Sequence, residues 1–85
     1  MNDNVEKAIN LADKIELMET LWTGELIPTD ELIQDINELL ELLELILIVA
    51  PKHRPLENYI AKTKEKRAKY LEILEEEKQE EEAEE

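Results

Sequence analysis

The chain of 85 residues contains no cysteine, no serine and no phenylalanine, and it has only one glycine and three prolines. Without cysteine it can form neither a disulfide nor a thiolate metal site, and without cysteine or serine it lacks the usual side-chain nucleophiles. One glycine and three prolines mark few turns, so we expect few secondary-structure elements and long ones. A chain this short buries only about 60% of the surface of its unfolded form, which predicts one small domain.

Motifs of catalytic and cofactor sites are missing as well. The sequence has no glycine-rich phosphate loop, no calcium-binding loop and no Glu-x-x-His pair for a di-iron bundle. His53, the only histidine, cannot build a common zinc site, and we interpret it as a solvated residue of a proline-bounded loop. The sequence therefore predicts a protein that is not an enzyme and that takes no cofactor, metal or small-molecule substrate.

No segment has the character of a membrane span or a secretory signal. The most apolar run, Leu45 to Ala50, has six residues, whereas a span needs about 20. The first residues, MNDNVEK, are polar and acidic, unlike a signal peptide. We expect a cytoplasmic protein without membrane contact.

Fourteen leucines and nine isoleucines dominate the apolar content, among many strong helix formers. Aliphatic residues in such surroundings favour helices packed on helices. The expected fold is all-α, a three-helix up-down bundle with a long third helix. Seven residues are predicted to form its inaccessible centre: Ile9, Ile15, Ile36, Leu39, Leu43, Ile46 and Ile60.

The first helix is predicted over residues 4–23, where apolar residues recur at spacings of three and four. Asp3 can cap it, with Glu6 as the reciprocal partner. Gly24 follows at the position where helices often end in the left-handed conformation. Trp22, at the end of this helix, is interpreted as a plug for the end of the bundle, with an exposed anchor for a partner as the alternative.

The second helix is predicted over residues 30–50, with Thr29 or Asp30 as its cap and Pro51 as its stop. One apolar stripe runs along its whole length. A second apolar stripe on the opposite side contains Leu42, Leu45, Ile48 and Val49. Two neighbouring helices can cover only one broad face, so we predict that this second stripe pairs with its copy in a homodimer.

The third helix is predicted over residues 55–77, with Pro55 as its first residue. Its inner seam is thin at Lys66 and Arg67, whose aliphatic stems can cover apolar surface while their charges reach water. Residues 78–85 are almost entirely acidic, so we expect a bundle domain over residues 1–77 and an acidic tail over 78–85, either a fraying helix end or disordered.

The net charge of −13 is divided into three blocks. Residues 1–51 carry twelve acids and two bases, residues 52–69 carry seven bases and two acids, and residues 70–85 carry nine acids and one base. Such segregation bears on partners and solubility. The candidate patch for nucleic acid or another anionic partner consists of Lys52, Arg54, Lys62, Lys66, Arg67 and Lys69.

These observations predict a non-catalytic protein-interaction module, a small adaptor, regulator or inhibitor that acts by occupying a surface as a homodimer. One alternative is a nucleic-acid-binding module that uses the basic segment 52–69. Another is an acidic mimic of nucleic acid, because carboxylates three and four positions apart on a helix are spaced broadly like phosphates. The competing interpretation of the basic segment is a solvated helix whose lysines balance acids on neighbouring helices.

Overall fold

A computed structural model describes residues 3–84 of the chain, and the side chains of residues 3–81. It contains three helices in a single up-down-up arrangement: α1 (Asp3–Thr23), α2 (Thr29–Val49) and α3 (Arg54–Glu84). No strand occurs in the described part of the chain. The predicted helical class and helix order are therefore confirmed, and α3 continues seven residues beyond its predicted end.

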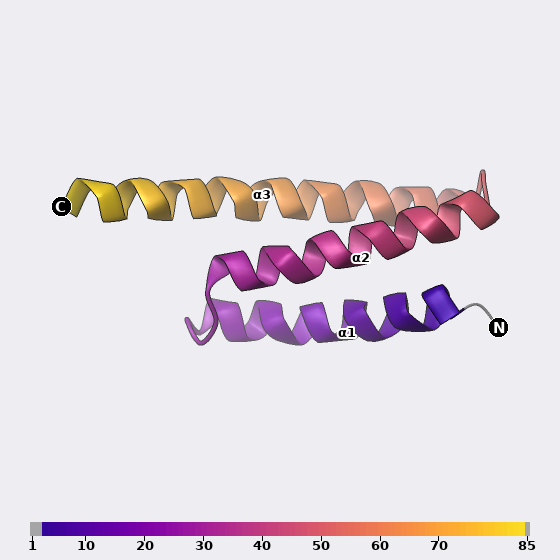
Figure 1. Cartoon of the computed structure of the whole chain (residues 1–85), viewed down its shortest axis with the longest axis horizontal. Helices are drawn as coiled ribbons and strands as arrows, with labels where there is room; N and C mark the ends of the chain where they lie inside the picture. Colours follow the sequence, from indigo (N-terminus) through magenta and orange to yellow (C-terminus); the bar gives the residue numbers. More distant parts are fainter. Residues whose placement is uncertain (1–2, 85) are drawn as a thin grey trace.

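The helix α2 lies between the other two (Figure 1) and beneath the space that separates them, so the three form a bent layer. Close backbone contacts join α1 to α2 and α2 to α3, but within residues 3–84 no Cα atoms of α1 and α3 come within 8 Å of each other. The last part of α3 extends past the loop between α1 and α2, which leaves the acidic end of the chain without a neighbouring helix. A closed three-helix bundle would instead bring α1 against α3.

The core follows the main apolar stripe of α2. Leu32 and Ile36 are fully buried, and α1 and α3 contribute fewer buried residues than α2 does. Five of the seven predicted central residues are buried: Ile15, Ile36, Leu39, Leu43 and Ile60. Ile46 is only partly buried.

The prediction for Ile9 is wrong, because 57% of this residue is exposed. Ile9 lies on α1 at the edge that points toward α3, and α3 is too far away to cover it. Helical periodicity places Ile9 on the apolar side of α1 correctly. It does not reveal that α3 lies too far away to cover this side of α1.

The turn after α1 is a Schellman motif that differs from the prediction in one position. The Leu26 amide bonds to the Leu21 carbonyl and the Glu25 amide to the Trp22 carbonyl, both at 2.9 Å. Glu25 has the left-handed conformation, with φ at 62°, and Gly24 does not. The expectation for Gly24 is therefore wrong by one residue, because α1 includes one more helical amide bond, from Gly24 to Thr20.

The start of α2 also differs from its prediction. Pro28 occupies the N-cap position, and no side chain caps the helix. Thr29 is already the first helical residue and is buried. Its hydroxyl is therefore free to bond to other helices rather than to the end of its own.

At the start of α3, the only histidine has a structural role that its loop position did not suggest. The amide of Leu56 donates a hydrogen bond of 3.2 Å to the Nδ1 atom of His53, and the amide of Glu57 bonds to the His53 carbonyl. His53 thus acts as the N-cap, satisfying one of the free amides of the first turn. The helix starts at Arg54, and Pro55 is its second residue.

Candidate interaction surfaces

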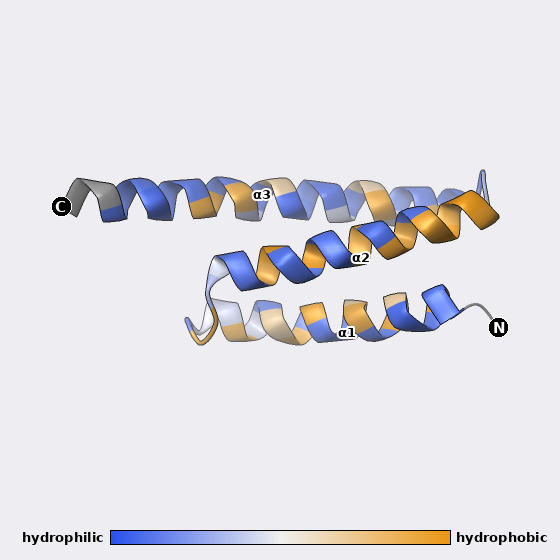
Figure 2. Cartoon of the chain, in the orientation of Figure 1, coloured by the Kyte–Doolittle hydropathy of each residue, from blue (hydrophilic) through white to orange (hydrophobic). Residues whose placement is uncertain are grey.

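The last two turns of α2 present large aliphatic side chains to solvent. Ile48 and Val49 are 75% and 73% exposed, and Leu45 is 48% exposed. Leu42, the fourth member of the predicted stripe, is partly buried against the core. Figure 2 colours the ribbon at this end of α2 as hydrophobic. We call Leu45, Ile48 and Val49 the α2 patch.

The α2 patch adjoins a shallow groove of about 550 Å³ between α1 and α2. Leu11, Leu42 and Leu45 form its apolar part. Its charged rim consists of Lys7, Lys14, Glu38 and Glu41. The surface around the α2 patch therefore combines an apolar strip with charges of both signs.

Lysines of the basic segment of α3 form ion pairs with acids on both of the other helices. Lys66 forms an ion pair with Glu19 of α1 at 2.8 Å, and Lys64 forms one with Glu44 of α2 at 3.6 Å. These lysines balance acids of the same chain. The geometry therefore favours the interpretation of a solvated, charge-balanced helix over that of a continuous cationic face.

The remaining residues of the predicted patch are spread along α3 and the turn before it. Lys52 lies in the turn before α3, with φ at 68°, and Arg54 is the first residue of that helix. Lys62 and Lys69 are exposed, while Arg67 is partly buried on the side of α3 that meets α2. Within the described side chains, the Nε atom of Arg67 has no hydrogen-bond partner.

Aromatic and polar side chains close the end of the layer where α1 turns into α2. Trp22 and Tyr70 meet edge to face, with ring centroids 5.0 Å apart and planes at 78°. The Trp22 indole donates a 2.9 Å hydrogen bond to the Thr29 hydroxyl, which in turn donates one of 2.8 Å to the Glu77 carboxylate. Trp22 is partly buried against the core, which agrees with its interpretation as a plug.

The hydroxyl of Tyr70 has a raised pKa. Burial of its hydroxyl, together with the hydrogen bond to Glu19 and the charge of Glu19, raises the pKa of Tyr70 to about 12. Both effects disfavour the phenolate, because a buried anion beside a carboxylate loses hydration and gains repulsion. At neutral pH Tyr70 is therefore a fixed hydrogen-bond donor, with a structural role rather than an acid–base one.

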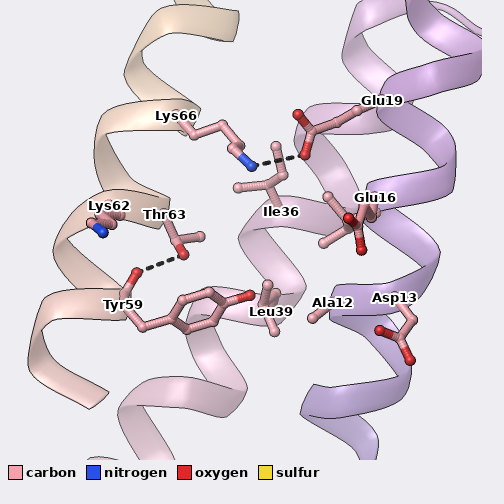
Figure 3. Close-up of a pocket in the computed structure, with 11 residues that line it drawn as sticks. Ala12, Asp13, Glu16, Glu19, Ile36, Leu39, Tyr59, Lys62, Thr63 and Lys66 are labelled. Carbon is pink, nitrogen blue, oxygen red and sulfur yellow. Dashed lines mark hydrogen bonds and ion pairs between the residues drawn. The ribbon is translucent and has the colours of Figure 1, made fainter. Parts of the chain in front are cut away.

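A second groove, of about 480 Å³, runs between α1 and α3 with α2 as its floor (Figure 3). Ile36 and Leu39 of α2 form the floor. One wall is acidic and belongs to α1, with Asp13, Glu16 and Glu19; the other belongs to α3, with Lys62 and Lys66. Ala12 of α1 and Thr63 of α3, two short side chains, are among the residues that line the groove.

Toward the start of α1 this groove becomes apolar. The continuation has a volume of about 310 Å³ and shares Ala12, Asp13 and Tyr59 with the first part. Its other lining residues are Val5, Ala8, Ile9, Leu43, Ile46 and Leu56. We call the two parts together the α1–α3 groove. The sequence analysis missed it because the groove depends on the distance between two helices that are far apart in the chain.

Other kinds of site find no support in the described residues. No group of three or more His, Cys, Asp or Glu side chains within them is placed to hold a metal ion. No helix in the described part of the chain is long and apolar enough to cross a membrane. Comparisons with protein-family models, with curated proteins and with solved structures found no match to this chain.

Proposed function

We propose that this chain is a non-catalytic protein-interaction module that associates with itself through the α2 patch. The observation that carries the proposal is the exposure of Leu45, Ile48 and Val49 in successive turns at one end of α2. Leaving a Val, Leu or Ile side chain in water forgoes about 1.5–3 kcal/mol relative to full burial. Adjacent aliphatic residues that no helix of the chain covers are typical of a binding surface.

A two-fold axis through the α2 patch would bring each copy of it against its twin, because that symmetry joins identical surfaces. The same axis would bring Glu41 near the Glu41 of the other copy, since this residue lies one turn before Leu45 on the same side of α2. Repulsion between these carboxylates weakens the dimer, and dissolved ions screen it. Self-association should therefore become stronger as the salt concentration rises.

Sedimentation over a concentration series tests the proposal. The double substitution Leu45→Glu with Ile48→Lys should make the protein monomeric without unfolding it, because both positions are exposed within one chain. The matched control is Leu17→Glu, which introduces a charge at a residue that is 61% exposed on α1, outside the α2 patch and both grooves. A wild-type protein that stays monomeric at high micromolar concentration would overturn the proposal.

Nucleic-acid binding through residues 52–69 has less support, because Lys64 and Lys66 already pair with acids of the chain. An electrophoretic retardation assay with DNA and RNA distinguishes this alternative: affinity should fall steeply with salt if the segment neutralises phosphates. The acidic-mimic alternative finds some support in the end of α3, where exposed acids project on a helix beyond the other two. Competition between the protein and DNA for a DNA-binding protein would test it.

A further inference from the structure

We infer that the α1–α3 groove is a second self-association surface, and that a second copy of this chain, related by a two-fold axis along the groove, occupies it. This surface lies on the side of the layer away from the α2 patch. On a helix with about 100° per residue, Leu45 lies roughly 160° around α2 from Leu43, which lines the groove. The inference therefore does not depend on the α2 patch.

The first observation is the apolar surface that the groove leaves in water. Ile9, Val5 and Tyr59 line it and are all exposed, although each belongs to the apolar seam of its helix. Below them the floor is formed by core residues of α2. An exposed apolar surface continuous with the core differs from single exposed residues, because a partner can extend the core through it.

The second observation is the arrangement of charges on the two walls. Glu16 of α1 and Lys62 of α3 lie on opposite walls, next to the ion pair between Glu19 and Lys66 (Figure 3). Neither Glu16 nor Lys62 forms an ion pair with any residue in the described part of the chain. The groove thus keeps unpaired charges of both signs among its described residues, Asp13 and Glu16 on the α1 wall and Lys62 on the α3 wall, with Glu16 and Lys62 at about the same level along its length.

A two-fold axis parallel to the helices makes this face complementary to itself. Such an axis preserves the level along the groove and exchanges the walls, so α3 of one copy lies over α1 of the other. Lys62 of each copy then meets Glu16 of its partner, and Tyr59 meets the exposed side of Ile9. Two equivalent ion pairs and one continuous apolar contact result from one symmetry operation.

Charge balance also favours a second copy as the occupant of this face. Two chains of net charge −13 repel each other. The α1–α3 groove carries three acids and two bases, so it is close to neutral. Its walls span Val5 to Glu19, a length of about 21 Å on a helix, and the apolar part, from Val5 to Ala12, covers roughly two turns of this length.

Single substitutions of Lys62 and Glu16 provide the test. Lys62→Glu and Glu16→Lys each place like charges opposite one another twice in a dimer formed through the groove, so each variant alone should associate roughly tenfold or more weakly than wild type. An equimolar mixture of the two variants should associate again at near wild-type strength. In the mixed dimer, both contacts join a positive to a negative residue.

Sedimentation of each variant and of the mixture measures these outcomes, with circular dichroism as the check that both variants fold. Restored association in the mixture supports the groove, since a change in the stability of one chain cannot be corrected by a different chain. A mixture that stays as weakly associated as its components overturns the inference, as do single variants that associate like wild type.

The same measurements distinguish the groove from the α2 patch. Ile9→Glu should weaken association through the groove by roughly tenfold or more and leave the α2 patch unchanged, while Leu45→Glu with Ile48→Lys should do the reverse. Association that is lost only in the second variant overturns the groove and supports the α2 patch alone. Association that is lost only with Ile9→Glu supports the groove and overturns the proposed function of the α2 patch.

Discussion

The Tyr70 hydroxyl donates a 2.8 Å hydrogen bond to the Glu19 carboxylate, and thereby joins α3 to α1 where the two backbones do not touch. Lys66 binds the other oxygen of the same carboxylate. Glu19 therefore receives one neutral and one charged donor from α3. This link and the Trp22–Tyr70 contact hold α1 and α3 in position at one end of the layer.

This hydrogen bond predicts a loss of stability in alkali. Because the pKa of Tyr70 is raised to about 12 in the folded protein, the folded state keeps a proton that the unfolded state releases near pH 10. Between these values the unfolded state binds fewer protons, so the free energy of unfolding falls as pH rises. By pH 11 the loss should be on the order of 1–2 kcal/mol.

Urea unfolding between neutral pH and pH 11 measures this effect, and Tyr70→Phe is the control. The variant keeps the ring and loses the titrating hydroxyl, while all lysines remain. Its stability should decline less with pH than that of the wild type. Parallel declines for the two proteins would contradict the assignment.

The turn after α1 predicts a stabilising substitution. Glu25 holds a left-handed φ of 62°, which costs a residue with a Cβ atom more than it costs glycine. Glu25→Gly should therefore raise the free energy of unfolding by about 0.5–1 kcal/mol, although glycine also makes the unfolded chain more flexible. Thermal unfolding followed by circular dichroism provides the measurement.

The neighbouring glycine provides the matched control. A Cβ atom at Gly24 would meet its nearest neighbour, the Leu21 carbonyl oxygen, at 3.6 Å, and the backbone there has no positive φ. Gly24→Ala should thus be tolerated and should stabilise by about 0.4–1 kcal/mol through the unfolded state. Strong destabilisation by Gly24→Ala would show that Gly24, and not Glu25, holds the left-handed position.

Two leucines of α2 should differ sharply in their contribution to stability. Leu43 is 4% exposed and belongs to the core, whereas Leu45, two residues on, is 48% exposed. Leu43→Ala should cost about 2–5 kcal/mol, enough to unfold a domain of this size. Leu45→Ala, measured in dilute solution where copies do not associate, should cost less than about 1 kcal/mol. A loss below this value at Leu43 would contradict its central position.

We predict that the part of α3 that stabilises the fold ends at Glu77. Glu77 accepts the hydrogen bond from Thr29, while residues 78–85 contain no large apolar side chain. Deletion of residues 78–85 should leave the melting temperature almost unchanged. Glu77→Ala should instead lower the free energy of unfolding by about 1–2 kcal/mol, because the buried Thr29 hydroxyl loses its hydrogen-bond acceptor. A large drop after deletion alone would show that the acidic end makes specific contacts.

The residues that sequence analysis placed correctly depend on local pattern. Spacings of three and four residues identified all three helices and the buried stripe of α2, and the second stripe correctly indicated exposure of Leu45, Ile48 and Val49. The spacing of side chains around a helix is fixed by backbone geometry, so the sequence is enough to determine it. The functional use of these residues remains a proposal.

Only the tertiary structure decided what lies between α1 and α3. The exposure of Ile9 and the pairing of Lys66 with Glu19 both depend on the distance between α1 and α3, which the whole of α2 separates in the chain. That separation depends on packing: the rings of Trp22 and Tyr70 meet at one end, and further along the helices leave a groove that Ala12 and Thr63 help to line. Helical periodicity gives the direction of each side chain, but the packing of all three helices decides which residue it meets.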